Sequence, residues 1–360
     1  MISPLPRSPL AAQAADALRD GIRRGAWGDS LPPEKVLARQ LGIGRYSLRA
    51  ALARLVRDGV VAVHKGRRAR IHRRPVARAG DARPELCLLT SSSPGAPSLI
   101  GHHLLLELRA ELAGRQIGWT EEADARVDRP RPDAYLRQLV AGRRHACWLL
   151  VSVPAAVQRW FAQAGVPVLV AGSCHEGVRL PSVDIDYHAV GWHAAGALAQ
   201  RGHRRVAVVL PSRPMPGDLA CRRGFGAYLA RRPAPLSVIE LDAGPNPAAL
   251  QHQLDRTFAG PDRPTAVLTL VLKDALGILF HLQRRRLQVP ADVSLLSAEN
   301  SPLLDQGLPE LARYSVSPRK QARRIVRYTQ ALLAGNPLPA RSSLITPAFV
   351  PGSTLAPPGG

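Results

Sequence analysis

The stretch LPPEKVLARQLGIGRYSLRAALARLVRDGVVAVHKGRRARI, residues 31–71, decides the fold of the first part of the chain. Its apolar residues follow helical spacing over about 33–40 and again over about 45–58, and Gly42 and Gly59 end these two helices. Two strands, at 60–64 and 69–71, then flank a basic turn at 65–68. Two short helices followed by a cationic hairpin predict a winged helix-turn-helix, whose second helix enters a DNA major groove.

The helix over about 45–58 has one apolar and one cationic face. The positions expected in the core are Leu48, Ala51, Leu52, Leu55 and Val56. Arg45, Tyr46 and Arg49 lie on the opposite face, where they can reach a partner. A further helix is predicted upstream, from Pro9 to about Gly25, with an inner stripe of Leu10, Ala14, Leu18 and Ile22.

Residues 8–72 closely resemble the GntR family of bacterial transcription factors. The motifs that carry the resemblance are Leu31-Pro32-x-Glu34, Ile43-x-Arg45-x-x-Leu48-Arg49-x-Ala51-Leu52, Leu55-x-x-Asp58-Gly59-Val60 and Gly66-Arg67. The resemblance implies phosphate contact by Lys35, base contact by Arg45 and Arg49, and minor-groove approach by Gly66. The implied DNA contacts are, together, Lys35, Arg45, Tyr46, Ser47, Arg49, Lys65, Gly66 and Arg67. Arg68 departs from the family, which usually has a second wing glycine there.

Charge is concentrated where this motif lies. The chain of 360 residues has a formal net charge of +22, and residues 1–84 carry 18 Lys and Arg against 6 Asp and Glu. This distribution favours a polyanionic partner at the N-terminal end. The remaining basicity has a simpler explanation, because 45 of the 49 basic residues are arginine, as in the proteins of a GC-rich genome.

Targeting signals and reactive cysteines are not evident in the sequence. No apolar run approaches the roughly 20 residues that span a bilayer, and the first 20 residues lack the apolar core of a signal peptide. Four scattered cysteines without metal or disulfide spacing fit a reducing compartment. We therefore expect a cytoplasmic protein without cofactor or metal. Cys87 and Cys147 are expected in core strands, whereas Cys174 and Cys221 could both face a binding cleft and leave a redox role open.

From residue 85 onward, short apolar runs alternate with helical segments. Strands are predicted at 86–90, 146–153, 166–171, 206–211, 237–241, 266–270 and 293–297, and helices at 104–113, 155–164, 190–201, 224–231, 247–259 and 274–286. This alternation predicts an α/β fold, a parallel sheet with helices on both faces. The length exceeds the usual core of one sheet, so two α/β lobes are expected. A linker is predicted at 75–84 and a flexible tail at 351–360.

Residues 85–350 resemble the effector domain of the LacI/galactose repressor family, which has the periplasmic-binding-protein type I fold. The resemblance rests on Gly165-Val166-Pro167-Val168, Pro181-Ser182-Val183-Asp184-Ile185-Asp186, Gly202-His203-Arg204-Arg205-Val206, Gly224-Phe225, Pro264-Thr265-Ala266-Val267 and Val289-Pro290-Ala291-Asp292-Val293-Ser294. It implies that the chain crosses between two lobes near Asp186, Ser317 and Leu344, with a ligand between the lobes. A GntR segment at 1–74 joined to such a domain resembles the arabinose-repressor architecture.

The expected ligand cleft departs from the family. The arginine of sugar-binding members is replaced by Cys221, and their Asn-Asp pair is replaced by Val271-Leu272. Where they have Phe-Asp-Asp after the strand predicted at 293–297, this chain has Ala298-Glu299-Asn300. Charged planar side chains suit hydroxyl-rich ligands, so their loss argues against an ordinary aldose. The candidate effector contacts are Ser91, Ser92, Asp186, Cys221, Arg222, Glu299 and Asn300. Asp186 could instead only cap the helix that follows it, and Ser91 and Ser92 could be plain loop residues.

The sequence thus predicts a transcriptional regulator, in the first place a repressor, that binds a palindromic operator as a homodimer and responds to a small molecule. A regulator whose α/β domain is only a dimerisation scaffold remains an alternative. A transport-type solute-binding protein is disfavoured by the missing signal peptide and the arginine-rich winged helix. No phosphate-binding loop, nucleophile motif or paired carboxylates argue for an enzyme.

Overall fold

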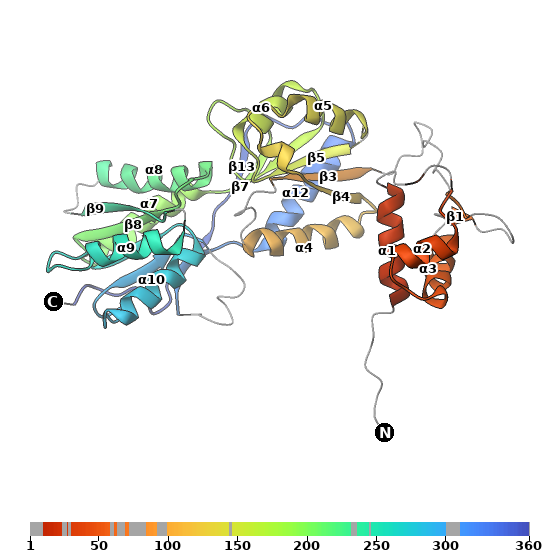
Figure 1. The fold of residues 1–360 in the computed structure, drawn as a ribbon. Coiled ribbons are helices and arrows are strands. Elements are labelled where there is room, and N and C mark those ends of the chain that lie inside the picture. Colours follow the sequence, from red (N-terminus) through yellow and green to blue (C-terminus); the bar gives the residue numbers. More distant parts are fainter. Residues whose placement is uncertain are drawn as a thin grey trace. The chain divides into compact units, whose positions relative to one another are not determined.

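A computed structural model describes residues 10–23, 27, 30–57, 61–62, 69–71, 84–91, 99–143, 146–231, 236–244, 246–299 and 310–359 (Figure 1). The chain forms two compact units, Met1–Ala82 and Arg83–Gly360. The predicted start of the first helix at Pro9, the predicted helix end at Gly59, the basic turn at 65–68 and most of the linker at 75–84 lie outside the described residues.

The N-terminal unit contains the predicted three helices and a two-stranded sheet. Its elements are α1 (Leu10–Arg23), α2 (Glu34–Gln40), α3 (Arg45–Arg57), β1 (Val61–Ala62) and β2 (Arg70–Ile71), with β1 and β2 antiparallel. Gly42 follows α2 with φ +64°, a conformation that favours glycine and ends the helix. Leu18, Leu37, Leu48 and Leu55 from the three helices are buried together. Helical spacing therefore located both the helices and most of their core.

One predicted core position in this unit is wrong. Val56 is 42% exposed, whereas Leu55 beside it is buried. On the helical wheel Val56 lies about 100° from Leu55, at the edge of the buried stripe formed by Leu48, Ala51, Leu52 and Leu55, so its side chain stays largely outside the core.

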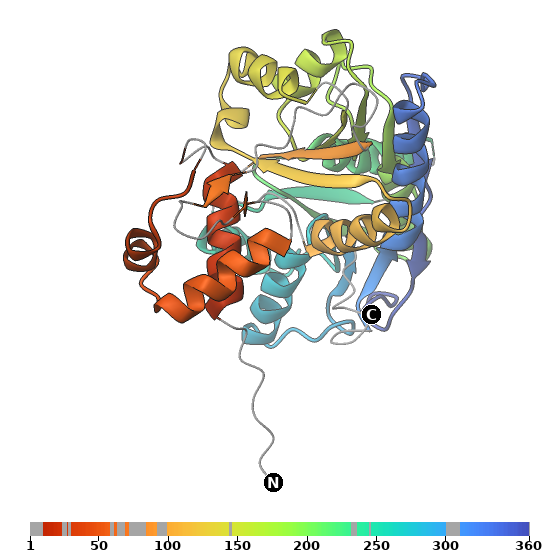
Figure 2. The same cartoon turned by 90° about the vertical axis from the view of Figure 1, so that its right-hand side faces the viewer.

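The first lobe of the C-terminal unit is a six-stranded, entirely parallel sheet. Its strands, in spatial order, are β13 (Ser342–Ile345), β7 (Ser182–Ile185), β6 (Val168–Ala171), β5 (Ala146–Val151), β3 (Glu85–Thr90) and β4 (Gly118–Ala123). Helices α4 (Leu99–Ala113) and α12 (Pro318–Leu333) cover one face, and α5 (Asp133–Ala141) and α6 (Ala155–Gln163) cover the other. In Figure 2, α4 lies on the opposite side of the orange and yellow strands from the yellow helices.

The second lobe has a matching sheet in which only the last pairing is antiparallel. Its spatial order is β14 (Ala348–Val350), β12 (Ala312–Ser315), β11 (Ser294–Ser297), β10 (Ala266–Thr269), β8 (Arg205–Leu210) and β9 (Ser237–Asp242). Helices α7 (Tyr187–Gln200) and α8 (Pro216–Arg231) cover one face, and α9 (Pro247–Thr257) and α10 (Leu272–Arg284) the other. The predicted α/β fold with two lobes is confirmed.

Two glycines let α7 and α8 approach closely. A Cβ atom on Gly191 would lie 1.9 Å from the carbonyl oxygen of Cys221, and one on Gly224 would lie 2.0 Å from that of His188. Any side chain at either position would overlap the backbone of the facing helix, so this pair is packed backbone to backbone.

The chain passes between the lobes three times. It leaves the first lobe after β7, at Asp186, returns after β12, at residues 316–317, and leaves again between β13 and β14, at residues 346–347. These places agree with the predicted crossings near Asp186, Ser317 and Leu344. Each lobe is consequently built from segments far apart in the sequence.

The predicted flexible tail is wrong for residues 351–359. Thr354 accepts a hydrogen bond from the Leu295 N–H at 2.8 Å, and the carbonyl of Ala356 lies 2.9 Å from Nε2 of His203. Leu355 is buried in the core of the second lobe. Proline and glycine give this segment the composition of a linker, although its hydrogen bonds to Ser294 and Leu295 of β11 make it part of the folded lobe.

Candidate DNA-reading surface and lobe junction

Helix α3 presents three of the predicted DNA contacts to solvent. Arg45, Tyr46 and Arg49 are all exposed, and Tyr46 is 94% exposed. Arg45 and Arg49 are four residues apart, so they lie on one side of the helix. Lys35 on α2 is exposed as well, whereas Ser47 is half-buried. The structure thus brings the α3 side chains together on the surface that helical spacing predicted.

Arg49 is held by an ion pair between the two helices. Its Nε donates to the Glu34 carboxylate at 3.0 Å, and both side chains are substantially exposed. Such an exposed pair contributes little to stability, and in this structure it orients the guanidinium. Because Nε is used, the two terminal nitrogens remain as the fork that can pair with O6 and N7 of a guanine. Glu34 is a functional candidate that sequence reasoning used only as part of a motif.

The base of the wing is folded as predicted. Val61 pairs with Ile71 and Ala62 with Arg70, and the Leu31 N–H donates to the Ala69 carbonyl at 2.8 Å. The hairpin is therefore attached to the segment that precedes α2. The three predicted wing contacts, Lys65, Gly66 and Arg67, lie outside the described residues.

At the junction of the lobes, two predicted effector residues cap helices. The Asp186 carboxylate accepts a hydrogen bond from the Ala189 N–H at 2.9 Å at the start of α7. Glu299 follows β11 and accepts from the Leu272 N–H at 2.8 Å at the start of α10. Carboxylates at these helix N-termini pair with backbone N–H groups that have no acceptor within the helix. The capping role that the sequence left open for Asp186 is present in the structure.

The other predicted effector residues are placed differently. Ser91 donates to Asp128 at 2.5 Å, and Arg222 forms an ion pair with Glu240 of β9 at 3.5 Å. Cys221 is 1% exposed and lies within the core of the second lobe, because α8 turns this position toward α7. Cys221 therefore does not form an open wall between the lobes, and burial raises its thiol pKa to about 12. Ser92 and Asn300 lie outside the described residues.

Four residues that were not predicted as site residues meet at this junction: Ser173, Asp184, Tyr187 and Asp218. Tyr187 lies near the carboxylates of Asp184, Glu299 and Asp218; burial first, and then these charges, raises its pKa well above the ordinary range. Ser173, from the first lobe, donates to Asp184, and a Cβ on Gly217 of the second lobe would lie 3.3 Å from the Ser173 hydroxyl oxygen. Burial raises the pKa of both Asp184 and Asp218 to about 6. Of these residues, only Asp184 had a signal in the sequence, the motif Asp184-x-Asp186.

The cysteines lie within or against the cores of the two lobes. Cys87 and Cys147 are buried in β3 and β5, as predicted, and Cys174 is half-buried against the first-lobe core. Across the ranges that the structure describes, no group of three His, Cys, Asp or Glu side chains is arranged to hold a metal ion. Within the same ranges, no helix has the length and apolar character needed to cross a membrane.

Two family models match the chain. Residues 10–71 match the bacterial regulatory proteins of the gntR family, and residues 195–355 match a periplasmic binding protein-like domain. The N-terminal unit is thus a GntR-type helix-turn-helix, and the C-terminal unit contains a periplasmic-binding-protein-like domain. The matches confirm the GntR resemblance over residues 10–71 and the periplasmic-binding-protein resemblance over residues 195–355.

Individual relatives match parts of the chain. Catabolite control protein A of Priestia megaterium is 27% identical over 150 residues, which are 41% of this chain and 45% of that protein. The HTH-type transcriptional repressor NanR of Klebsiella aerogenes is 37% identical over 107 residues, 29% of this chain and 40% of that protein. The matched stretch spans less than half of either relative. These relatives are named as regulators rather than enzymes.

A solved structure shows the same fold for the C-terminal unit. The dimeric Lac repressor with an 11-residue C-terminal deletion superposes with a TM-score of 0.65 at 16% identity, covering 76% of this chain and 100% of that chain. At this identity the likeness concerns the two-lobed architecture alone.

Proposed function

We propose that this chain, which joins a GntR-type DNA-reading segment to a periplasmic-binding-protein-like domain, is a DNA-binding transcriptional repressor controlled by a small molecule between its lobes. The observation that carries the proposal is the exposed set Arg45, Tyr46 and Arg49 on α3, with Arg49 oriented by Glu34 at 3.0 Å. In this proposal residues 1–74 read DNA, 75–84 link, and 85–350 bind the effector and the second copy. The protein acts in the cytoplasm on a palindromic operator.

Dimerisation is supported by an apolar surface on α10. Leu276 and Phe280 are four residues apart on that helix, and Phe280 is 66% exposed. Exposed apolar side chains on one helix face favour burial against a partner. A second copy packed there gives a C2 dimer with two reading heads, which suits a palindrome. The dimeric Lac repressor, named as such, shares the fold.

The effector is proposed to bind where Tyr187, Asp184, Asp218 and Glu299 converge. In open α/β sheets, ligands bind beyond the carboxyl ends of the strands, and Glu299 lies two residues after the end of β11. Ligand contacts to both lobes would change their closure and so the spacing of the two reading heads.

A scaffold without ligand is the second candidate function. Asp186, Glu299 and Arg222 each have a partner within the chain, so three predicted effector contacts already serve the fold. Mass spectrometry of the protein purified under native conditions separates the two functions. A bound small molecule in stoichiometric amount supports the effector site. If no small molecule is bound and the purified protein still binds DNA, the scaffold function is supported.

The DNA-reading role of α3 is tested by Arg49→Ala. This variant should lose about 1–3 kcal/mol of binding to a sequence obtained by in vitro selection, because one bidentate base contact is removed. Arg54→Ala removes the same charge from a later exposed turn of α3 and should leave sequence preference unchanged. Fluorescence anisotropy with selected and scrambled duplexes measures both. Equal losses on the two duplexes in Arg49→Ala would show that Arg49 contacts only phosphate.

Simple sugars should fail to stabilise the protein. Cys221, which occupies the position of the family's arginine, is buried in the core. Val271 and Leu272 occupy the positions of the family's asparagine and aspartate. A bound aldose would leave hydroxyls unpaired, at about 1–3 kcal/mol for each buried group. Arabinose, galactose and ribose at millimolar concentration should therefore leave the melting temperature unchanged in a thermal shift assay. A saturable increase with any of them would mean that other residues form the sugar site.

A further inference from the structure

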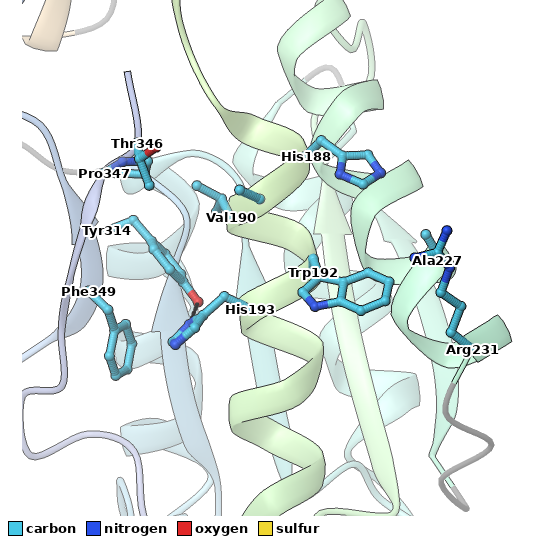
Figure 3. A pocket seen from close by; sticks show the side chains of 11 residues that line it. His188, Val190, Trp192, His193, Ala227, Arg231, Tyr314, Thr346, Pro347 and Phe349 are labelled. Carbon is cyan, nitrogen blue, oxygen red and sulfur yellow. Dashed lines mark hydrogen bonds between the residues drawn. The ribbon is translucent and has the colours of Figure 1, made fainter. Parts of the chain in front are cut away.

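A pocket of about 670 Å³ lies on the second lobe, along the outer side of α7 (Figure 3). Its volume is within the range of small-molecule sites. It is separate from the residues that meet at the lobe junction, because Tyr187, Asp184, Asp218 and Glu299 do not line it. The lining comes from α7, α8, β12, β14 and the third crossover.

Three aromatic side chains and two histidine rings contribute to the walls of the α7 pocket. Figure 3 shows Tyr314 and Phe349 on one side of α7 and Trp192 on the other. Tyr314 and Phe349 have ring centroids 5.3 Å apart, and the Tyr314 hydroxyl lies 2.7 Å from Nδ1 of His193. These contacts hold the rings in place before any ligand arrives, which reduces the entropy lost on binding.

The charge of the pocket is positive. The guanidinium of Arg231 lies over the Trp192 ring, 5.7 Å from its centroid. None of the 11 described residues that line the pocket is acidic. Burial lowers the pKa of His193, so at neutral pH its ring is a neutral hydrogen-bonding group and Arg231 supplies the formal charge. An aromatic cavity with one cation at its rim suits a ligand with an apolar body and an anionic head.

We propose that the α7 pocket is a second ligand site that binds an elongated carboxylate with an aromatic or apolar body. The carboxylate pairs with Arg231 beside Trp192. The body extends across Val190 toward Tyr314 and Phe349. Recognition thus uses one charged hydrogen-bonding pair and an apolar channel.

The position of the pocket connects it to all three crossovers. His188 follows the first crossover by two residues, Tyr314 precedes the second by two, and Thr346 and Pro347 form the third. Segments between lobes absorb the backbone changes of domain closure. A ligand in the α7 pocket contacts these segments together and restrains the movement of the lobes. This regulatory consequence rests on the proposed function, whereas the binding itself does not.

Binding is tested by isothermal titration calorimetry of the full chain with 4-phenylbutyrate as the probe. We expect saturable binding, and at least tenfold weaker binding of 4-phenylbutan-1-ol, which has the same body without the charge. Arg231→Gln should weaken 4-phenylbutyrate binding about tenfold, since a hydrogen-bonded charge pair is lost. Arg204→Gln, an exposed arginine of the same lobe outside the pocket, should bind like the unmodified protein. Equal effects of the two substitutions, or no saturable binding, would overturn the site.

Hydrogen exchange locates the same ligand independently. With 4-phenylbutyrate present, amides over residues 187–193 and 346–350 should exchange at least threefold more slowly, because these segments line the pocket and its crossover. Protection confined to residues around Ser173, Asp184 and Glu299 would place the ligand at the lobe junction and refute the α7 pocket. Loss of the proposed DNA binding would not change the binding of 4-phenylbutyrate to the α7 pocket. The proposed function and the α7 pocket are therefore tested independently.

Discussion

Replacing Gly191 with alanine should lower the free energy of unfolding of the α/β unit by at least about 3 kcal/mol. The new Cβ would lie 1.9 Å from the Cys221 carbonyl oxygen, which belongs to the backbone of α8. Overpacking a well-packed core typically costs about 1–3 kcal/mol, and here no side chain can rotate away, so α7 and α8 must separate. Urea unfolding of the full chain, followed by circular dichroism, measures the loss.

Gly226→Ala is the matched control for this prediction. Gly226 lies on α8, and among the described residues no atom beyond its chain neighbours and the backbone of its own helix lies within 4 Å of an added Cβ, so alanine should stabilise the helix by up to about 1 kcal/mol. If both alanine variants unfold at the same urea concentration, the two helices are not in backbone contact at Gly191.

Phe280→Asp should abolish the dimer that we propose and leave the protein monomeric. Phe280 is 66% exposed on the α10 surface that we propose as the interface, with Leu276 one turn away. A buried carboxylate without a partner opposes association strongly. Because two linked heads bind a palindrome with avidity, the monomer should lose at least about 100-fold in operator affinity. Light scattering gives the oligomeric state, and anisotropy with the selected duplex gives the affinity.

Met215→Asp provides the comparison for Phe280→Asp. Met215 is also an exposed apolar residue of the second lobe, but it precedes α8. This variant should remain dimeric and bind DNA normally. A dimeric Phe280→Asp protein would move the interface to another surface, whereas monomers of both variants would indicate general destabilisation of the lobe.

Sequence patterns identified strands that read as continuous apolar runs and missed strands that lack such a run. Strands β3, β5, β8 and β10 are central and buried on both faces, so they read as continuous apolar runs. Strand β4 is an edge strand with the sequence GWTEEA and alternating partial exposure. It has no apolar run that could distinguish it from a loop. Strands β7, β12, β13 and β14 were missed for the same reason, although β7 and β12 lie inside their sheets.

Helix boundaries depended on contacts that a sequence does not display. Helix α8 begins at Pro216, well before the predicted residue 224. Its first turns contain Gly217, Cys221 and arginines, which have no clear apolar stripe, but these turns pack on α7 and the lobe junction. Helix α12 was not predicted because arginines dominate it, although Ala322, Ile325 and Val326 form a narrow buried stripe.

The candidate site was predictable only where the chemistry is local. Arg45, Tyr46 and Arg49 share a helix face by spacing alone, and α3 exposes them. The meeting of Ser173, Asp184, Asp218 and Glu299 depends on the arrangement of four separate segments. Cys221 was placed on an open wall by its position in a motif, whereas the orientation of α8 directs it into the core.

The three crossovers also govern how the α/β unit can be completed during synthesis. When residues 84–185 have left the ribosome, the strands β3 to β7 exist, but β13 and α12 have not yet been made. The sheet face that contains Leu149, Leu169 and Val183, which α12 covers in the finished protein, stays open until residue 333 has emerged. Exposed apolar surface of this kind invites aggregation of a nascent chain. The first lobe is therefore the part of the chain that we expect a chaperone to hold while the second lobe is translated.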